Sequence, residues 1–157
     1  MTKTQVEECY LEQLYTFCDL NRDPRSRVIS IAYLGLLSEQ AANKYDQYRF
    51  EIITGKNELR FQNNALSLTA KDLGFDHYNI IQKALERLRA KIIYTDIVFN
   101  LMPELFTLTQ LQNVYEIITG KKETTANFRR KVMPMLKEAN TFTSDMGHRP
   151  AMLYKKN

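Results

Sequence analysis

The stretch FTLTQLQNVYEIITGKKETTANFRRK, residues 106–131, decides the fold because its pattern predicts two helices joined by a short turn. Thr107 and Gln110 have the spacing of a capping box, which places a helix start at this point. Apolar residues then recur at helical period, and Gly120 supplies the left-handed conformation that ends many helices. We therefore predict a first helix that ends near Thr119.

A second helix is predicted after this turn, capped by Thr124 or Thr125. Pro134 lacks a backbone donor, so a kink or an early end is expected near Met133. The buried stripe of this helix is predicted to consist of Phe128, Val132, Met135 and Leu136.

The outer face of the second helix is basic. At helical period Arg130 lies almost opposite the apolar stripe with Asn127 beside it, while Arg129 and Lys131 lie on the flanks. This layout is typical of a DNA recognition helix, in which one or two polar side chains reach base edges and flanking cations contact phosphates. The alternative is an ordinary solvated helix face, and the helix alone does not decide between the two.

Two β-prone runs follow, at residues 141–144 and 151–154, and a turn-rich link at residues 145–150 joins them. This pattern predicts a two-stranded wing with Arg149 near its tip. His148 stands in the link without a histidine, cysteine or acidic cluster nearby in the sequence, so no metal is assigned to it. Helix, turn, helix and β-ribbon together predict a winged helix-turn-helix.

Positive charge is concentrated in the same part of the chain. Residues 121–157 contain nine lysines or arginines and three acidic residues, whereas the first 120 residues contain thirteen and fifteen. Such segregation favours a polyanionic partner for the C-terminal part, and it strengthens the interpretation of the second helix as a DNA-contacting element.

Composition sets the class of protein. At 157 residues, with 44% hydrophobic and 25% charged residues, the chain suits one ordinary globular domain or two small ones. No signal peptide is recognisable and no apolar run approaches the roughly 20 residues of a membrane span, so a cytoplasmic protein without a membrane partner is expected. Cys9 and Cys18 lack metal-ligand spacing and are expected to pack as small hydrophobic residues. No catalytic constellation stands out.

The N-terminal half is predicted to be rich in β-strands. Residues 10–17 are aromatic and apolar enough for a strand, and residues 27–37 form a near-continuous apolar run, as expected of a strand buried on both faces. Three arginines, Arg22, Arg25 and Arg27, lie in or beside the polar loop between these strands. They are either surface charges of a hairpin connection or contacts for an anion such as a phosphate.

Further elements connect this half to the winged helix. Residues 48–53 and 59–62 predict a hairpin. A helix is predicted to begin with Asp76 as its cap and to run to about Ile93. Residues 100–104 are predicted to be a hinge, because the proline within them disfavours helix at the residue before it. The apolar stripe of the helix is predicted to be Ile81, Ala84, Leu85, Leu88 and Ile92.

Two groups of sequence blocks resemble one protein family. YLEQLYTF (residues 10–17) and RDPRSRVISIAYLGLL (residues 22–37) resemble the second half of a Nudix domain, as found in Nudix-related transcriptional regulators and related ADP-ribose pyrophosphatases. The blocks that resemble the winged-helix part of the same family are LGFDHYNIIQKALERLR (73–89), FTLTQLQNVYEIITGK (106–121), NFRRK (127–131) and GHRPAMLY (147–154). Their joint occurrence in this order is specific.

The resemblance implies an α+β fold, with a truncated Nudix-like, β-rich region at residues 1–74 followed by a linker helix and winged helix-turn-helix at residues 75–157. It implies a transcriptional regulator that binds double-stranded DNA as a homodimer and senses an ADP-ribose-like nucleotide. The implied effector contacts are Arg22, Arg25 and Arg27. Taken with the basic pattern, the resemblance predicts DNA contacts at Lys121, Lys122, Thr125, Asn127, Arg129, Arg130, Lys131, His148 and Arg149.

The Nudix box is the part of the family pattern that this chain lacks. That box, a metal-binding loop-helix-loop with a glycine and a run of glutamates and arginines, should precede residues 10–17, and only nine residues stand before them. We therefore expect no catalytic residues, no metal and no cofactor. The alternative is a Nudix hydrolase of the ADP-ribose pyrophosphatase type, or a fragment of one. A sheet without its first half would expose edges and apolar faces, so self-association is predicted.

Overall fold

A computed structural model describes residues 9–43, 51–54, 59–62, 66–144 and 150–157. The chain divides into two compact units, and each is described by itself. One unit comprises Leu11–Gly35 and Ala42–Arg87, and the other contains Leu36–Ala41 and Leu88–Asn157. This division falls inside a helix, whereas the boundary predicted between residues 74 and 75 follows the sequence blocks and stays a prediction.

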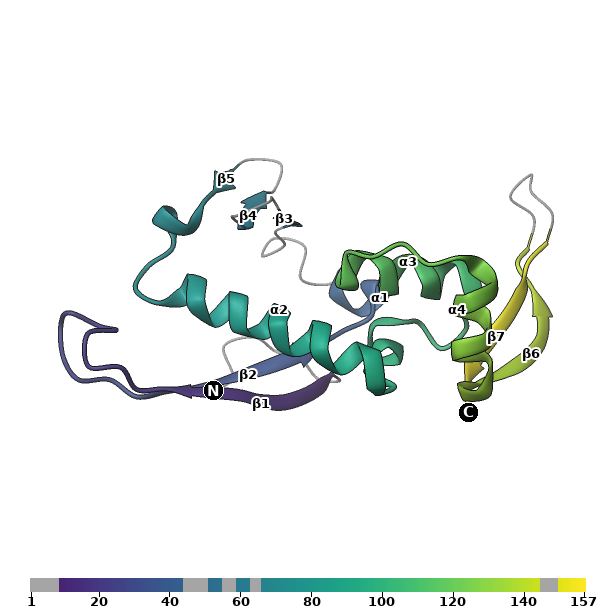
Figure 1. Ribbon diagram of the computed structural model, residues 1–157, viewed down its shortest axis with the longest axis horizontal. Helices are drawn as coiled ribbons and strands as arrows, with labels where there is room; N and C mark the ends of the chain where they lie inside the picture. The colour runs from purple at the N-terminus through teal and green to yellow at the C-terminus, as the bar shows by residue number, and fades with distance from the viewer. Residues whose placement is uncertain (1–8, 44–50, 55–58, 63–65, 145–149) are drawn as a thin grey trace. The chain divides into compact units, whose positions relative to one another are not determined.

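The N-terminal unit contains a two-stranded ribbon with a helix along it. The predicted strands are confirmed as β1 (Tyr10–Phe17) and β2 (Ser30–Leu36), which pair with each other. Helix α2 (His77–Tyr94) runs beside this ribbon (Figure 1). The Nη2 atom of Arg87 donates to the carbonyl oxygen of Leu14 at 3.2 Å and ties the helix to β1.

Strand β2 corrects the prediction of burial on both faces. Its side chains alternate between half-buried and exposed, and Ile31 and Tyr33 are 56% and 58% exposed. Ile29, which precedes the strand, is exposed as well. A continuous apolar run predicts cover on two sides, but only one face of β2 is covered by the described part of the chain.

A second small sheet in the same unit contains β3 (Glu51–Thr54), β4 (Leu59–Gln62) and β5 (Ser67–Leu68) in that order. The predicted hairpin is confirmed by the antiparallel register that pairs Glu51 with Gln62 and Thr54 with Leu59. Thr54 therefore belongs to the strand rather than to the link, and residues 48–50 lie outside the described residues. The 3-10 helix η2 (Ala70–Asp72) belongs to this unit, whereas α1 (Glu39–Ala42) lies mostly in the other one.

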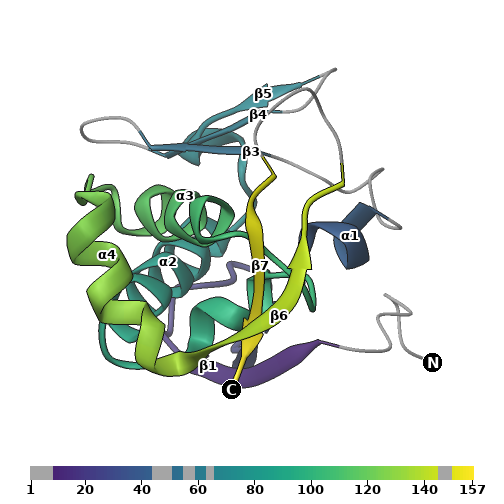
Figure 2. The same ribbon diagram turned by 90° about the vertical axis from the view of Figure 1, so that its right-hand side faces the viewer.

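The C-terminal unit has the predicted helix, helix and ribbon order (Figure 2). Phe106, Leu111 and Phe128 form the centre of its core, each at most 2% exposed. Phe106 also forms an isolated antiparallel bridge with Tyr154 of the ribbon, which ties the start of the helical pair to the wing. The elements are η3 (Ile97–Leu101), α3 (Leu108–Thr119), α4 (Thr125–Val132), η4 (Met133–Met135), β6 (Leu136–Phe142) and β7 (Met152–Lys156).

Helix α3 confirms the local prediction in detail. The Thr107 hydroxyl accepts a hydrogen bond from the backbone N–H of Gln110 at 3.1 Å, and the Gln110 side chain accepts from the backbone N–H of Thr107 at 2.8 Å. Gly120 adopts the left-handed conformation with φ 67° and ends the helix. Both ends are therefore fixed by short-range contacts, which is why the sequence alone predicts them.

Helix α4 is shorter than its predicted stripe. Thr124 is its cap, and the helix ends at Val132 as the downstream proline predicted. Met135 therefore lies in η4 and Leu136 begins β6, so neither belongs to the helical stripe.

The wing strands also differ from their predicted bounds. The first strand, β6, begins five residues before the predicted start at residue 141, and β7 extends to Lys156. The register shifts between Glu138 and Phe142, where Asn140 has φ 54°. The link at residues 145–149 lies outside the described residues.

At residues 100–104 the predicted end of helix is confirmed, because η3 stops at Leu101 and Met102 has extended backbone with ψ 151°. Their role as a hinge stays a prediction. Two other expectations are corrected. Cys9 and Cys18 are both exposed instead of packed. Asp76 stands ahead of α2 as predicted, but its carboxylate accepts hydrogen bonds from an arginine side chain, as described below.

Candidate nucleic-acid interface

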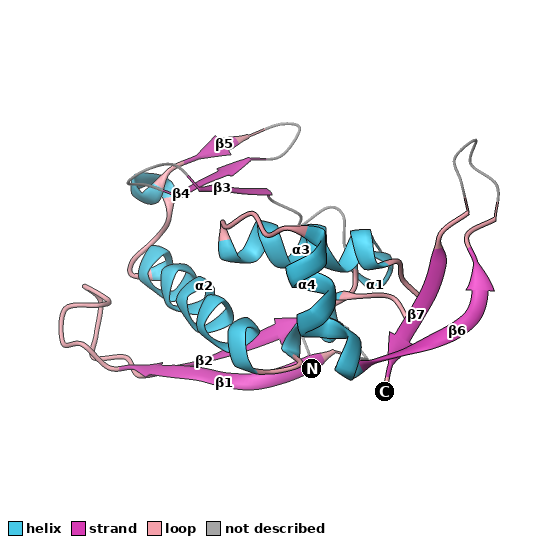
Figure 3. Ribbon diagram, turned by 45° about the vertical axis from the view of Figure 1, so that its right-hand side comes forward, coloured by secondary structure: helices cyan, strands magenta, loops and turns pink. Residues whose placement is uncertain are grey.

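Helix α4 presents a polar face whose residues the sequence placed correctly. Phe128 and Val132 are buried at 1% and 3%, while Asn127, Arg129 and Arg130 are exposed. The Nη2 atom of Arg130 donates to Oδ1 of Asn127 at 3.3 Å, so two side chains one helical turn apart are held together. Figure 3 shows α4 and the wing strands that follow it in this unit. An amide beside a guanidinium offers the donors and acceptors that read base edges in the major groove.

Lys131 contacts α3 and the turn while remaining partly exposed to solvent. Its ammonium group donates to the hydroxyl of Tyr115, lies 4.2 Å from the centroid of that ring and lies 3.9 Å from Oε1 of Glu123. The side chain is 35% exposed. These contacts favour a packing role, and its predicted contact with DNA stays a prediction.

The turn before α4 supplies further cations. Lys121 and Lys122 are both exposed, and Nζ of Lys122 lies 3.0 Å from Oε2 of Glu116. Thr125 is the first residue of α4 and is exposed, while the neighbouring Thr124 caps the helix. Of the predicted contacts, Lys121, Lys122 and Thr125 therefore precede or begin α4, at the end that a phosphate approaches most favourably, whereas Arg129, Arg130 and Lys131 lie in its last turn.

Gln112 and Glu116 lie beneath this turn and were missed by the sequence prediction. They are four residues apart on α3, and Nε2 of Gln112 donates to Oε1 of Glu116 at 2.9 Å. A backbone hydrogen bond from Glu123, the Gln112 amide and the Lys122 ammonium lower the pKa of Glu116 to about 2. The spacing of four residues was the only signal in the sequence, because it places both side chains on one face of the helix.

The wing contributes two lysines that the sequence prediction also missed. Lys137 on β6 lies directly across from Lys155 on β7, so two like charges share one face of the ribbon. Both are exposed. They were missed because the predicted strands were too short to bring residues 137 and 155 into register. His148 and Arg149, the predicted contacts at the wing tip, lie outside the described residues.

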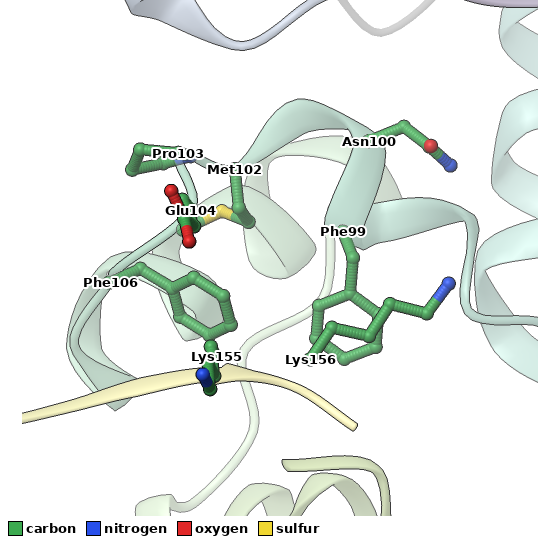
Figure 4. Close-up of a pocket in the computed structure, with 8 residues that line it drawn as sticks. All are labelled: Phe99, Asn100, Met102, Pro103, Glu104, Phe106, Lys155 and Lys156. Atoms are coloured by element: carbon green, nitrogen blue, oxygen red, sulfur yellow. The ribbon is translucent and has the colours of Figure 1, made fainter. Parts of the chain in front are cut away.

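A cavity of about 290 Å³ opens at the other end of the ribbon. Figure 4 shows Lys155 and Lys156 from β7 beside the rings of Phe106 and Phe99, which are stacked with centroids 5.9 Å apart. The Thr143 to Ala151 hydrogen bond marks the wing-tip end of the strands. The cavity has no lining residue from α4. It is lined by Phe99, Asn100, Met102, Pro103, Glu104, Phe106, Lys155 and Lys156.

Comparison with protein families bears directly on this unit. Residues 98–155 match the family described as the NrtR DNA-binding winged helix domain. The match covers α3, α4 and β6, together with most of η3 and β7. Residues 98–155 are therefore similar to the winged-helix domain of NrtR.

Longer comparisons extend over nearly the whole chain. The chain is 36% identical over 156 residues to the protein described as the ADPR responsive transcriptional repressor NtrR of Acinetobacter baylyi, and it spans 59% of that protein's length. The crystal structure of Shewanella oneidensis NrtR complexed with a 27mer DNA has a TM-score of 0.70 and 29% identity, over 94% of this chain and 64% of that one.

A third protein is similar over nearly the whole chain at the level of the fold. A MutT/nudix family protein from Enterococcus faecalis has a TM-score of 0.73 at 24% identity, over 94% of this chain and 61% of that one. At this identity the likeness concerns the fold alone. Taken together, these comparisons confirm the predicted α+β architecture and the resemblance to Nudix-related regulators.

Arg22, outside the NrtR-type domain, is held inside its own unit. Its Nε and Nη2 atoms donate to the two carboxylate oxygens of Asp76 at 2.8 and 2.9 Å, and Nη1 donates to Oγ of Ser30 at 2.8 Å. The side chains of Arg22 and Asp76 are 7% and 12% exposed. Hydrogen bonding to Arg22 lowers the pKa of Asp76, so the pair is ionised at neutral pH. These contacts favour a structural role for Arg22, and its predicted contact with an effector stays a prediction.

Arg25, the second predicted effector contact, is far more exposed than Arg22. Its guanidinium bonds Asp23 at 3.0 and 2.8 Å, lies 4.8 Å from the ring centroid of Phe75 and remains 72% exposed. Phe75 is itself exposed and has φ 55°. Arg27 is exposed. The three predicted arginines are thus not equivalent, and their contact with an effector stays a prediction.

Within the described residues, no three histidine, cysteine, aspartate or glutamate side chains are grouped so that they could hold a metal ion. The described helices include none with the length and apolar character needed to cross a membrane.

Proposed function

We propose that this chain is a DNA-binding transcriptional regulator that uses α4 to read the major groove. The observation that carries the proposal is the exposed pair of Asn127 and Arg130 on the outer face of α4, within a domain that matches the NrtR DNA-binding winged helix family. Arg129 and the turn lysines Lys121 and Lys122 flank this pair and suit phosphate contacts. A regulator that acts on DNA also accords with the predicted cytoplasmic location.

The direct test is a titration on duplex DNA at several salt concentrations. Each phosphate contact adds about −0.9 to the slope of log K against log salt, so binding should weaken steeply as salt rises. Selection from random duplexes should then yield a preferred sequence. Absence of binding at low salt would make the basic face an ordinary solvated surface.

We further propose that the N-terminal unit responds to an ADP-ribose-like nucleotide. The support is the printed description of the Acinetobacter baylyi relative as ADPR responsive, together with the exposed guanidinium of Arg25. ADP-ribose added to the DNA complex should change its apparent affinity, and Arg25→Ala should reduce this response more than Arg22→Lys does. ADP-ribose hydrolysis, measured as magnesium-dependent formation of AMP and ribose 5-phosphate, would instead support the alternative of a Nudix hydrolase.

A homodimer is the proposed assembly. Apolar side chains of β1 and β2 lie in solvent on one face of the ribbon, with Leu11 at 61%, Tyr15 at 51% and Tyr33 at 58% exposed. A large exposed apolar patch marks an interaction surface. Two winged helices would then contact half-sites about one helical turn, or a multiple of it, apart. Sedimentation should show a dimer, whereas a monomer at high micromolar concentration would contradict this proposal.

A further inference from the structure

The residue that precedes the cap of α4 is held on both sides of its backbone. The N–H of Glu123 donates to Oε1 of Glu116 at 3.0 Å, and its carbonyl oxygen accepts from Nε2 of Gln112 at 2.8 Å. Gln112 and Glu116 are also bonded to each other at 2.9 Å. These three contacts form a closed set, here called the turn clamp, that ties the turn to the body of α3.

The clamp is well suited to hold a fixed geometry. Glu116 has a side chain only 9% exposed, so its contacts are partly shielded from water. Hydrogen bonds to an ionised carboxylate are stronger than neutral ones, and shielding strengthens them further. The side-chain nitrogen of Gln112 donates both to Glu116 and to the carbonyl oxygen of Glu123. Loss of the Gln112 or the Glu116 side chain should therefore weaken the contact that the remaining side chain makes with Glu123.

A short series of contacts leads from the clamp to the face that reads DNA. Glu123 is followed by the cap Thr124, whose hydroxyl accepts from the backbone N–H of Asn127 at 3.4 Å. The Asn127 side chain in turn accepts from Arg130. Helix α4 has only eight residues, so the direction of its N-terminal end decides where these two side chains lie. Contacts with base edges tolerate errors of only about 0.5 Å.

We propose that Gln112 and Glu116 are positioning residues for DNA reading, because they fix the turn that aims α4. They reach no base themselves. This inference rests on the proposed function, and it predicts a specific consequence: their loss lowers affinity for the preferred sequence while leaving the general attraction to DNA intact. A merely structural role would instead lower thermal stability and both affinities together.

The test compares binding to the selected duplex with binding to a random duplex of equal length. Glu116→Ala and Gln112→Ala should each reduce the ratio of the two affinities about tenfold, equivalent to weakening one base-reading contact. Affinity for the random duplex and the salt slope should stay within about twofold. The double variant should lose little more than either single variant, because the two side chains act as one unit.

Two further variants separate positioning from general damage. Glu116→Gln keeps a carbonyl acceptor for the N–H of Glu123, so it should recover most of the affinity ratio. Asn113→Ala removes an exposed polar side chain from the same helix and should leave the ratio unchanged. Amide hydrogen exchange at Glu123 should accelerate in both alanine variants of the clamp and stay slow in Asn113→Ala.

An unchanged affinity ratio in folded Glu116→Ala and Gln112→Ala would overturn the positioning role while leaving the proposed function standing. A wild-type chain that shows no preference for any duplex would overturn the proposed function itself. The two failures are therefore distinguished by the wild-type measurement alone.

Discussion

Replacing Arg130 by alanine tests the orientation of α4 most directly. Arg130 is exposed opposite the buried Phe128, so its guanidinium should face the groove floor. Arginine has five N–H donors, and the bond to Asn127 engages one of them, which leaves enough for a bidentate contact with guanine. Such a contact contributes about 1 to 3 kcal/mol of discrimination, or about 5- to 150-fold in affinity.

The assay is selection of binding sites from random duplexes, followed by titration on the selected site. Arg130→Ala should lose affinity for that site and relax the preference at one base pair. Arg129→Ala is the matched control, since it removes the same side chain from the flank and should weaken all duplexes alike while lowering the salt slope by about one unit. Thermal stability of both variants should stay close to wild type, because both side chains lie at the surface.

The orientation proposed for α4 is wrong if Arg129→Ala alters the base preference and Arg130→Ala does not. A preserved base preference in Arg130→Ala, together with an altered preference in Arg129→Ala, would mean that α4 enters the groove rotated about its axis. DNA binding itself would survive that result.

Three other predictions follow from internal contacts. Lys131→Ala should reduce thermal stability and change the salt slope less than Arg129→Ala does, because the ammonium group is engaged by α3 and the turn. Arg22→Ala should destabilise the N-terminal unit in thermal unfolding, and adding Asp76→Asn should restore part of the loss by removing the uncompensated carboxylate. The pKa of Glu116 is lowered from 4.5 to about 2, so its ionised form stabilises the fold fully above pH 4.5 and this contribution is lost as the pH falls to about 2. The free energy of unfolding of Glu116→Gln should therefore change less with pH in this window than that of the wild type.

The winged helix shows which parts of a fold are readable from sequence. Both ends of α3 are fixed by residues no more than four positions apart, and the sequence predicted them correctly. The early end of α4 was also local, since it follows from one proline. The wing strands depend on pairing between residues 136–142 and 152–156, and their bounds were predicted poorly because no local signal encodes that register.

The candidate site shows the same limit in its charges. The sequence reveals which residues are cationic, but not which of them have a side-chain partner in the fold. Arg22 bonds to Asp76, 54 residues away in the sequence, and Lys131 bonds to Tyr115, 16 residues away. The sequence pattern therefore predicts the same phosphate contact for Arg129 and Lys131, although Lys131 is bonded to Tyr115 and Arg129 is exposed.

These surroundings divide the cations of the winged helix into two groups with different expected roles. The lysines with an acidic partner are Lys122 with Glu116, Lys131 with Glu123 and Lys156 with Asp96. To contact a DNA phosphate, each of these lysines would have to give up its carboxylate partner. Its net contribution to the salt-dependent attraction should therefore be smaller than that of an unpaired cation. Within the described part of this unit, Lys121, Arg129, Lys137 and Lys155 have no acidic partner. Of these, Lys121 and Arg129 flank the polar face of α4, so the attraction to DNA should come mainly from them and from Arg130. Lys122, which is 92% exposed, should add a smaller share, and Lys131 should serve chiefly to hold α4 against α3.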